Sequence, residues 1–131
     1  MHYVIIGAGP AAVAAAEKLR ILDEDGLITM IGSQAQPPYS RMAIPYYLTG
    51  KVEESGTYLR RSSDHFESHR IELVHGQATA IDAQGHKVML DDGSAINYGK
   101  LLIATGAEPI IPPVAGMDDP RVQQCLSLIH I

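Results

Sequence analysis

Two short glycine-containing segments, almost a chain length apart, carry the residues best suited to chemistry in this sequence. Each follows an apolar run: the first is Gly7-Ala8-Gly9-Pro10-Ala11-Ala12, the second Ala104-Thr105-Gly106. In the first, Gly7, Gly9 and Ala12 occupy the three small-residue positions of a G-x-G-x-x-G/A fingerprint. That spacing permits a tight turn, close approach of a pyrophosphate to the backbone, and close packing of a helix on a strand. It predicts a dinucleotide-binding loop.

The elements flanking the first segment are those that such a loop requires. Residues 2–6 form a β-branched apolar run without alternation, which predicts a strand buried on both faces of a parallel sheet. Pro10 suits the first turn of a helix, and residues 11–22 continue it with strong helix formers. A second buried strand at 27–31 would complete a β-α-β unit. The helix would then direct free N–H groups toward phosphates. The alternative is a glycine-rich turn with no ligand.

The end of the second predicted strand lacks the acid that usually binds a ribose hydroxyl in this type of loop. Gly32-Ser33-Gln34 occupies the position, and no arginine stands there to receive a 2′-phosphate. The side chain of Ser33 or of Gln34 could still hydrogen-bond a ribose hydroxyl, more weakly than a carboxylate. We take Ser33 as a candidate cofactor contact.

The rest of the chain predicts a mixture of loops, short helices and strands. Residues 36–41 should be an ordered loop because they contain two adjacent prolines. A short helix offset by Pro45 is predicted at 42–48, and a second helix from Ser62 or Ser63 to about Arg70. Strands are expected at 71–74, 78–82, 86–90, 94–98 and 101–104. Turn signals separate the middle three, which therefore predict an antiparallel meander.

The expected fold class is thus α/β: a Rossmann-like parallel sheet with an inserted three-stranded antiparallel β-meander. A length of 131 residues fits one domain with a core. Hydrophobic residues make up 46% and the net charge is −5, which argues against nucleic acid or an anionic membrane as a partner. No apolar run is long enough for a spanning helix, and the N-terminus lacks the order of a signal peptide. We therefore expect a cytoplasmic protein.

Cysteine and histidine usage gives little support for a metal site. Cys125 is the single cysteine, which excludes a disulfide framework and a cysteine-rich metal centre within these residues. His65 and His69 are four residues apart and could share a helix face, but no third ligand lies near them in the sequence. We expect surface helix positions for both and no bound metal.

The order of these segments resembles the pyridine nucleotide-disulfide oxidoreductase superfamily of flavoproteins, and within it the rubredoxin, ferredoxin and nitrite reductase-like branch. The resemblance covers nearly all of residues 2–120. The strand ending in Ala104-Thr105-Gly106 after a β-meander is far more discriminating than the first glycine motif. The segments that carry the resemblance are 3–12, 27–32, Pro37-Pro38-Tyr39-Ser40-Arg41, 76–82 and 98–113.

The resemblance implies FAD as the cofactor and a role for particular positions. Gly7, Gly9, Pro10 and Ala11 would surround the FAD pyrophosphate. Arg41 would face the flavin side, although a surface position after a proline loop is the alternative for this residue. The Ala78 backbone would address the adenine. The turn that closes over FAD would be formed by Ala104, Thr105 and Gly106.

The resemblance further implies the FAD-binding portion of an NAD(P)H-dependent oxidoreductase. Electrons would pass from NADH or NADPH through FAD to an unknown acceptor, either a small electron-transfer protein or a small molecule. Thiol–disulfide chemistry is disfavoured, because no Cys-x-x-x-x-Cys pair is present and no cysteine stands near Met42-Ala43. Tyr46 stands where ferredoxin reductase relatives often carry a lysine. No catalytic acid or base is visible.

Two other readings of the sequence remain open. One is a fragment of an FAD-dependent monooxygenase or oxidase, which would usually keep the ribose acid and lack the Pro-Pro-Tyr-Ser-Arg loop. The other is a non-catalytic dinucleotide-binding module. Relatives place a nicotinamide-binding domain later in the chain, so we expect residues 1–125 to be the N-terminal part of an FAD-binding domain.

The final hexapeptide, residues 126–131, reads Leu-Ser-Leu-Ile-His-Ile. It matches a translation of a transposon end used in sequencing libraries, CTG TCT CTT ATA CAC ATC. We therefore expect this tail to be adapter-derived rather than evolved protein. A natural apolar end that happens to match is the alternative.

Overall fold

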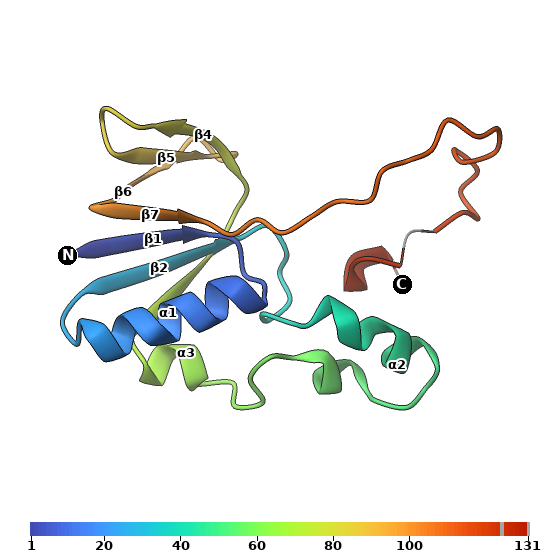
Figure 1. Ribbon diagram of the computed structural model, residues 1–131, viewed down its shortest axis with the longest axis horizontal. Helices are drawn as coiled ribbons and strands as arrows, with labels where there is room; N and C mark the ends of the chain where they lie inside the picture. The colour runs from blue at the N-terminus through green and yellow to red at the C-terminus, as the bar shows by residue number, and fades with distance from the viewer. Residues whose placement is uncertain (124, 131) are drawn as a thin grey trace.

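A parallel sheet of four strands forms the centre of the computed structural model, which describes residues 1–123 and 125–130 (Figure 1). In spatial order the strands are β3 (Ile71–His75), β2 (Leu27–Gly32), β1 (His2–Ile6) and β7 (Lys100–Ile103). Tyr3 pairs with Ile28 on one side of β1 and with Lys100 on the other. The chain therefore winds outward from β1 in both directions, as in dinucleotide-binding sheets.

Strand β1 is buried on both of its faces, as its unbroken apolar run predicts. Val4 and Ile5 are both fully buried, and adjacent residues of a strand point to opposite faces. Ile5 packs in one apolar cluster and Val4 in another. A layer must therefore cover each face of the sheet.

Helix α1 (Pro10–Leu22) and the short helix α3 (His65–Ser68) cover one face (Figure 1). Pro10 occupies the first turn of α1, where its missing N–H costs no hydrogen bond. Ala12 and Ala16 are fully buried, so small side chains bring the helix close to the strands. The buried cluster on this face contains Ile5, Ala12, Val13, Ala16, Ile28, Met30, Phe66 and Ile71.

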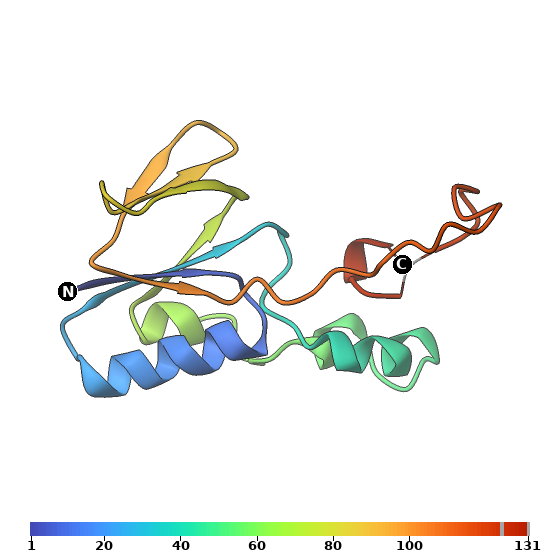
Figure 2. The same cartoon turned by 45° about the horizontal axis from the view of Figure 1, so that its top comes forward.

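The opposite face is covered by the predicted β-meander (Figure 2). Strands β4 (Ala78–Asp82), β5 (Lys87–Leu90) and β6 (Ala95–Asn97) pair antiparallel in sequence order. Val88 and Leu90 of β5 pack against the central sheet; the cluster contains Val4, Ile6, Ile31, Val88 and Leu90. This arrangement confirms the expected fold class.

The segment between β2 and β3 runs beyond the sheet before it returns. It contains a 3₁₀ turn at Arg41–Ala43, helix α2 (Ile44–Leu48) and a second 3₁₀ turn at Glu54–Thr57. The predicted offset at Pro45 is confirmed, because the 3₁₀ turn passes into α2 one residue before that proline. After β7 the chain leaves the sheet as an extended arm (Figure 1) and reaches a last 3₁₀ turn at Leu128–His130.

The prediction of a helix from Ser62 or Ser63 to Arg70 is wrong at both ends. Helix α3 starts only at His65, because the Ser62 hydroxyl hydrogen-bonds the Asp64 carboxylate and Asp64 makes no side-chain cap to the helix. Arg70 adopts a left-handed backbone, with φ of 51°, which ends the helical turn and redirects the chain into β3. Within residues 1–123 and 125–130, no helix has both the length and the apolar character needed to cross a membrane.

Candidate dinucleotide-binding site

The two glycine segments meet at the carboxyl edge of the sheet. Ile6 pairs with Ile103, which sets Gly7 beside Ala104. The Ala104 N–H donates to the Ile6 carbonyl at 2.8 Å, and the Gly7 N–H donates to the Ile31 carbonyl at the same distance. Ligands of open α/β sheets bind outside the carboxyl ends of strands, where the winding direction reverses. The predicted loop therefore lies at the expected place in the fold.

Gly7 is required by both its backbone angle and its neighbours. Its φ is +124°, a region that side-chain-bearing residues rarely adopt. A Cβ on Gly7 would overlap the Ala104 carbonyl and would lie 3.3 Å from the Thr105 nitrogen. The predicted tight turn is confirmed. The absence of a side chain at Gly7 lets the end of β1 contact the end of β7.

Gly9 and Gly106 differ from Gly7 because both border open space. A Cβ built on either residue would meet no heavy atom within 4 Å. Gly9 has an ordinary φ of −82°, so its conformation does not require glycine. A backbone with free space above it is what a pyrophosphate needs for close approach, so the residues present fit a bound dinucleotide. Ala12, by contrast, is a packing residue, because its side chain is fully buried.

The first turn of α1 is free of side-chain groups that would compete with an anion. Gly9 is the N-cap and makes no side-chain hydrogen bond to the helix, and the first turn contains no acidic residue. The first intrahelical bond runs from the Val13 N–H to the Gly9 carbonyl at 3.0 Å. The positive end of the helix dipole therefore faces the Gly9 opening without a neutralising carboxylate.

Arg41 joins the proline loop to the second glycine segment. Its Nη1 donates to the Ala107 carbonyl at 2.6 Å, across 66 residues of sequence. Arg41 is thus held by the backbone that follows the second glycine turn, and its predicted position on the flavin side stays a prediction. The bond brings the loop of residues 33–41 alongside the turn of Ala104, Thr105 and Gly106, so three segments that the sequence singled out are joined in space.

The loop after β2 carries three polar side chains in different environments, and the predicted contact between Ser33 and a ribose hydroxyl stays a prediction. Ser33 is exposed, and the Gln34 Oε1 already accepts a hydrogen bond of 2.6 Å from the Tyr39 hydroxyl. Gln36, which the sequence did not single out, has a buried Oε1 without a hydrogen-bond partner among the described residues. The two prolines after Gln36 indicate a fixed backbone, but no local pattern in the sequence indicates that this oxygen is buried.

Ala78 opens the meander close to this loop. The Gly76 N–H donates to the Gly32 carbonyl at 3.0 Å, which ties the approach to β4 to the end of β2. Ala78 pairs with Leu90, and the strand register shifts between Ala78 and Ala80. Ala78 is two residues after Gly76, which contacts the end of β2. The predicted contact between the Ala78 backbone and adenine stays a prediction.

A separate charged cluster holds α1 to the segment that precedes β3. Arg60 makes a two-pronged bond to Glu17, with both N···O distances 2.6 Å, and His65 Nε2 lies 2.8 Å from the same carboxylate. The Arg60 hydrogen bond holds the pKa of Glu17 below its ordinary value. Among the described residues there is no group of three or more His, Cys, Asp or Glu suited to a metal ion. The cluster acts as a structural clamp.

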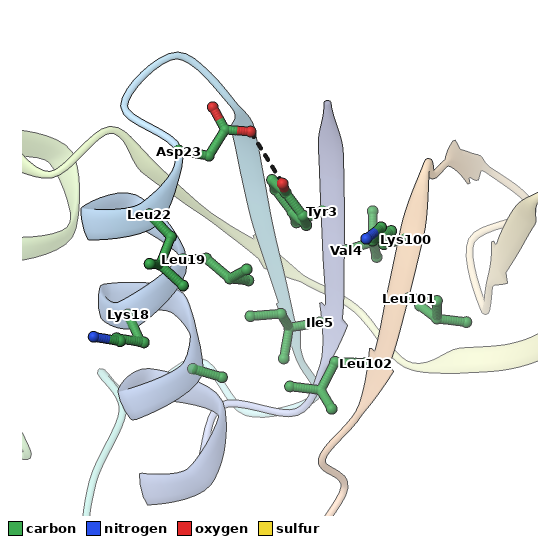
Figure 3. Close-up of a pocket in the computed structure, with 11 residues that line it drawn as sticks. Tyr3, Val4, Ile5, Lys18, Leu19, Leu22, Asp23, Lys100, Leu101 and Leu102 are labelled. Atoms are coloured by element: carbon green, nitrogen blue, oxygen red, sulfur yellow. Dashed lines mark hydrogen bonds between the residues drawn. The ribbon is translucent and has the colours of Figure 1, made fainter.

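An apolar groove of about 500 Å³ lies between α1 and β7 and contains none of the predicted site residues (Figure 3). Leu19 and Leu22 of α1 face Ile5 and Leu102 across it. At its polar end the Tyr3 hydroxyl donates to the Asp23 carboxylate at 3.0 Å. That hydrogen bond raises the pKa of Tyr3 and lowers that of Asp23. The groove is thus distinct from the glycine site.

Comparison with known proteins finds matches along almost the whole chain. Residues 1–128 match the family described as pyridine nucleotide-disulphide oxidoreductase. The NADH-dependent phenylglyoxylate dehydrogenase subunit epsilon of Aromatoleum evansii is 38% identical over 117 residues, covering 88% of this chain and 28% of that protein. The chain therefore spans little more than a quarter of the length of this curated relative.

Solved structures of related proteins share the fold. An NAD-dependent persulfide reductase from A. fulgidus superposes with a TM-score of 0.91 at 31% identity, over 99% of this chain and 25% of that one. The reductase in a covalent putidaredoxin reductase–putidaredoxin complex gives a TM-score of 0.81 at 35% identity, over 88% of this chain and 28% of that one. Both are similar in sequence as well as in structure.

Proposed function

This chain belongs to the pyridine nucleotide-disulphide oxidoreductase family, and we propose from that premise that it is the FAD-binding portion of an NAD(P)H-dependent flavoprotein oxidoreductase. The observation that carries the proposal is the contact between Gly7 and Ala104 at the carboxyl edge of the sheet. It joins a dinucleotide fingerprint to the second glycine turn, which a simple nicotinamide-binding domain does not need. The FAD-dependent monooxygenase or oxidase remains the alternative enzyme.

The residues of this chain would hold FAD rather than carry out its chemistry. Once bound, FAD supplies hydride acceptance from the nicotinamide and onward transfer of electrons. Gly9 and the first turn of α1 would bind the pyrophosphate through backbone N–H groups. Arg41 would fix the proline loop against the second glycine turn through its bond to Ala107. Gly106, with a φ of +78° and open space beside it, would let that turn close against the cofactor.

The electron acceptor that we propose is a small electron-transfer protein, with a small molecule as the alternative. Support comes from relatives whose names specify such partners, including a putidaredoxin reductase of Pseudomonas putida at 37% identity. A redox-active disulfide formed within these residues is not part of the proposal, because Cys125 is the single cysteine and is exposed. Electrons would therefore pass directly from FAD to the acceptor.

The domain assignment is likewise a proposal. Residues 1–125 would form the first part of the FAD-binding domain, and residues 126–131 would derive from adapter DNA. Sequencing the source gene from a library prepared without that transposon end tests the second point. A genomic reading frame that encodes Leu126 to Ile131 would contradict it.

Flavin spectroscopy tests the function. The full-length protein, of which residues 1–125 would be the first part, should purify with, or take up, FAD, and NADH or NADPH should bleach its flavin absorbance when oxygen is excluded. Residues 1–131 alone should bind FAD weakly and show no turnover with NADH. Reoxidation by a ferredoxin or rubredoxin would identify a protein acceptor. Binding of ADP or NAD without any binding of FAD would favour the non-catalytic dinucleotide-binding module. Bleaching that is stimulated by an organic substrate, followed by hydroxylation of that substrate when oxygen is readmitted, would favour the monooxygenase.

A further inference from the structure

Gln36 carries an oxygen for which the described part of the chain provides no hydrogen-bond donor. Its Oε1 is shielded from solvent and has no partner. An amide oxygen removed from water without a donor destabilises the fold, so an unsatisfied buried acceptor calls for an explanation. What this position lacks is a donor group.

Anchoring of the loop does not explain the buried oxygen, because other residues hold the loop on both sides of it. The Tyr39 hydroxyl binds Gln34 at 2.6 Å. The Leu59 N–H donates to the Pro38 carbonyl at 2.9 Å, and the Ser40 N–H donates to the Thr57 carbonyl at the same distance. The Gln36 oxygen takes part in none of these bonds, so the fold would keep the loop in place without it.

The loop that presents Gln36 borders both glycine segments. It starts at Gly32, where a Cβ would lie 3.1 Å from the Ala8 side chain. It ends at Arg41, which donates to the Ala107 carbonyl. Gln36 therefore lies on a loop whose two ends contact the two glycine segments, four residues after the strand β2 that lacks a ribose-binding acid.

The Gln36 Oε1 is a hydrogen-bond acceptor, so its partner in a ligand must be a donor. An ionised phosphate offers only acceptors and could not satisfy an amide oxygen, whereas a ribose hydroxyl is a donor. We propose that the Gln36 side-chain oxygen accepts a hydrogen bond from a hydroxyl of the adenosine ribose and so replaces the missing acid. This proposal rests on the proposed binding of FAD. The Gln36 amide would be a neutral ribose contact. The usual carboxylate would place a negative charge near the pyrophosphate.

The test compares flavins with and without the adenosine half, using the full-length protein of which these residues are the proposed first part. Gln36→Met keeps the length of the side chain but removes the acceptor, and should weaken FAD binding by about 3- to 10-fold, the effect of one hydrogen bond. FMN, which lacks the adenosine, should bind both proteins equally. An FAD analogue without the two adenosine ribose hydroxyls should bind the unmodified protein as weakly as FAD binds Gln36→Met. Gln36→Glu keeps an acceptor and should retain FAD binding.

Stability without ligand separates a binding role from a structural one. Since Gln36→Met removes an unsatisfied buried oxygen, the cofactor-free variant should melt at the same temperature as the unmodified protein or higher. Gln84→Met, in an exposed meander turn, is the matched control and should change neither quantity. A lower melting temperature with equal loss of FAD and FMN binding would overturn the proposal, as would unchanged FAD affinity. Failure of the unmodified protein to bind FAD would instead refute the proposed function itself.

Discussion

Gly7 illustrates how one residue can be required by the fold independently of any ligand. Its left-handed backbone and the adjacent Ala104 carbonyl both exclude a side chain. Gly7→Ala should therefore lower the free energy of unfolding by about 2 to 4 kcal/mol, measured by urea denaturation without cofactor. Gly50→Ala is the matched control, because Gly50 has a φ of +68° but no neighbour within 4 Å. Gly50→Ala should lower the free energy of unfolding by only about 1 to 2 kcal/mol. Equal losses in the Gly7 and Gly50 variants would show that the contact with Ala104 is unimportant.

Gly9, two residues after Gly7, should matter for FAD binding rather than for stability. Its ordinary φ and the open space beside it mean that Gly9→Ala should change stability by less than about 1 kcal/mol. A methyl group would nevertheless occupy the space through which a pyrophosphate must approach. FAD binding should weaken by about 10-fold or more, equivalent to about 1.4 kcal/mol, in a fluorescence titration. Unchanged FAD affinity would place the pyrophosphate elsewhere.

At the level of elements, the Glu17 carboxylate clamps α1 to the segment carrying Arg60 and His65. The Arg60 hydrogen bond lowers the pKa of Glu17 below its ordinary value of 4.5. A lowered pKa in the folded state means that the stabilisation is fully present above pH 4.5 and is lost as the pH falls through the folded-state pKa. Because Glu17 and Arg60 are 24% and 38% exposed, solvent screening keeps the effect small.

Glu17→Gln should accordingly lower the free energy of unfolding by about 0.5 to 1 kcal/mol at pH 7. The difference from the unmodified protein should shrink as the pH falls below 4.5 and disappear only below the lowered folded-state pKa of Glu17, where both side chains are uncharged. Glu108→Gln, at an exposed position in the arm that follows β7, should have no such effect. A loss from Glu17→Gln that persists undiminished at acid pH would show that packing, rather than charge, holds the elements together.

The same elements show what the sequence could and could not predict. Strand β1, helix α1 and the meander were predictable, because apolar runs, helix formers and turn residues act over a few neighbouring positions. The early end of α3 was not, since it depends on the left-handed backbone of Arg70. The Arg41–Ala107 bond and the buried Gln36 oxygen were also beyond prediction. Both arise from segments that meet only after the chain has folded.

At the level of the whole molecule, two different surfaces border the sheet. The carboxyl edge gathers the glycine segments, whereas the groove between α1 and β7 exposes apolar side chains (Figure 3). Leu22 is 71% exposed and Leu102 is 40% exposed on this side of the molecule. Exposed apolar area of this kind promotes association in an isolated domain, whether with copies of itself or with other chains.

Leu22→Gln in residues 1–131 should therefore reduce self-association, measured by sedimentation, and leave the free energy of unfolding within about 0.5 kcal/mol. Leu19, one turn earlier on α1, packs against the buried cluster of that face. Leu19→Gln should lower the free energy of unfolding by about 1 to 2 kcal/mol, because it removes apolar contacts between a partly buried side chain and the core. Neither change touches the carboxyl edge, so FAD affinity per folded molecule should stay the same in both variants. Loss of FAD binding in Leu22→Gln alone would mean that the groove, and not only the glycine site, contributes to cofactor binding.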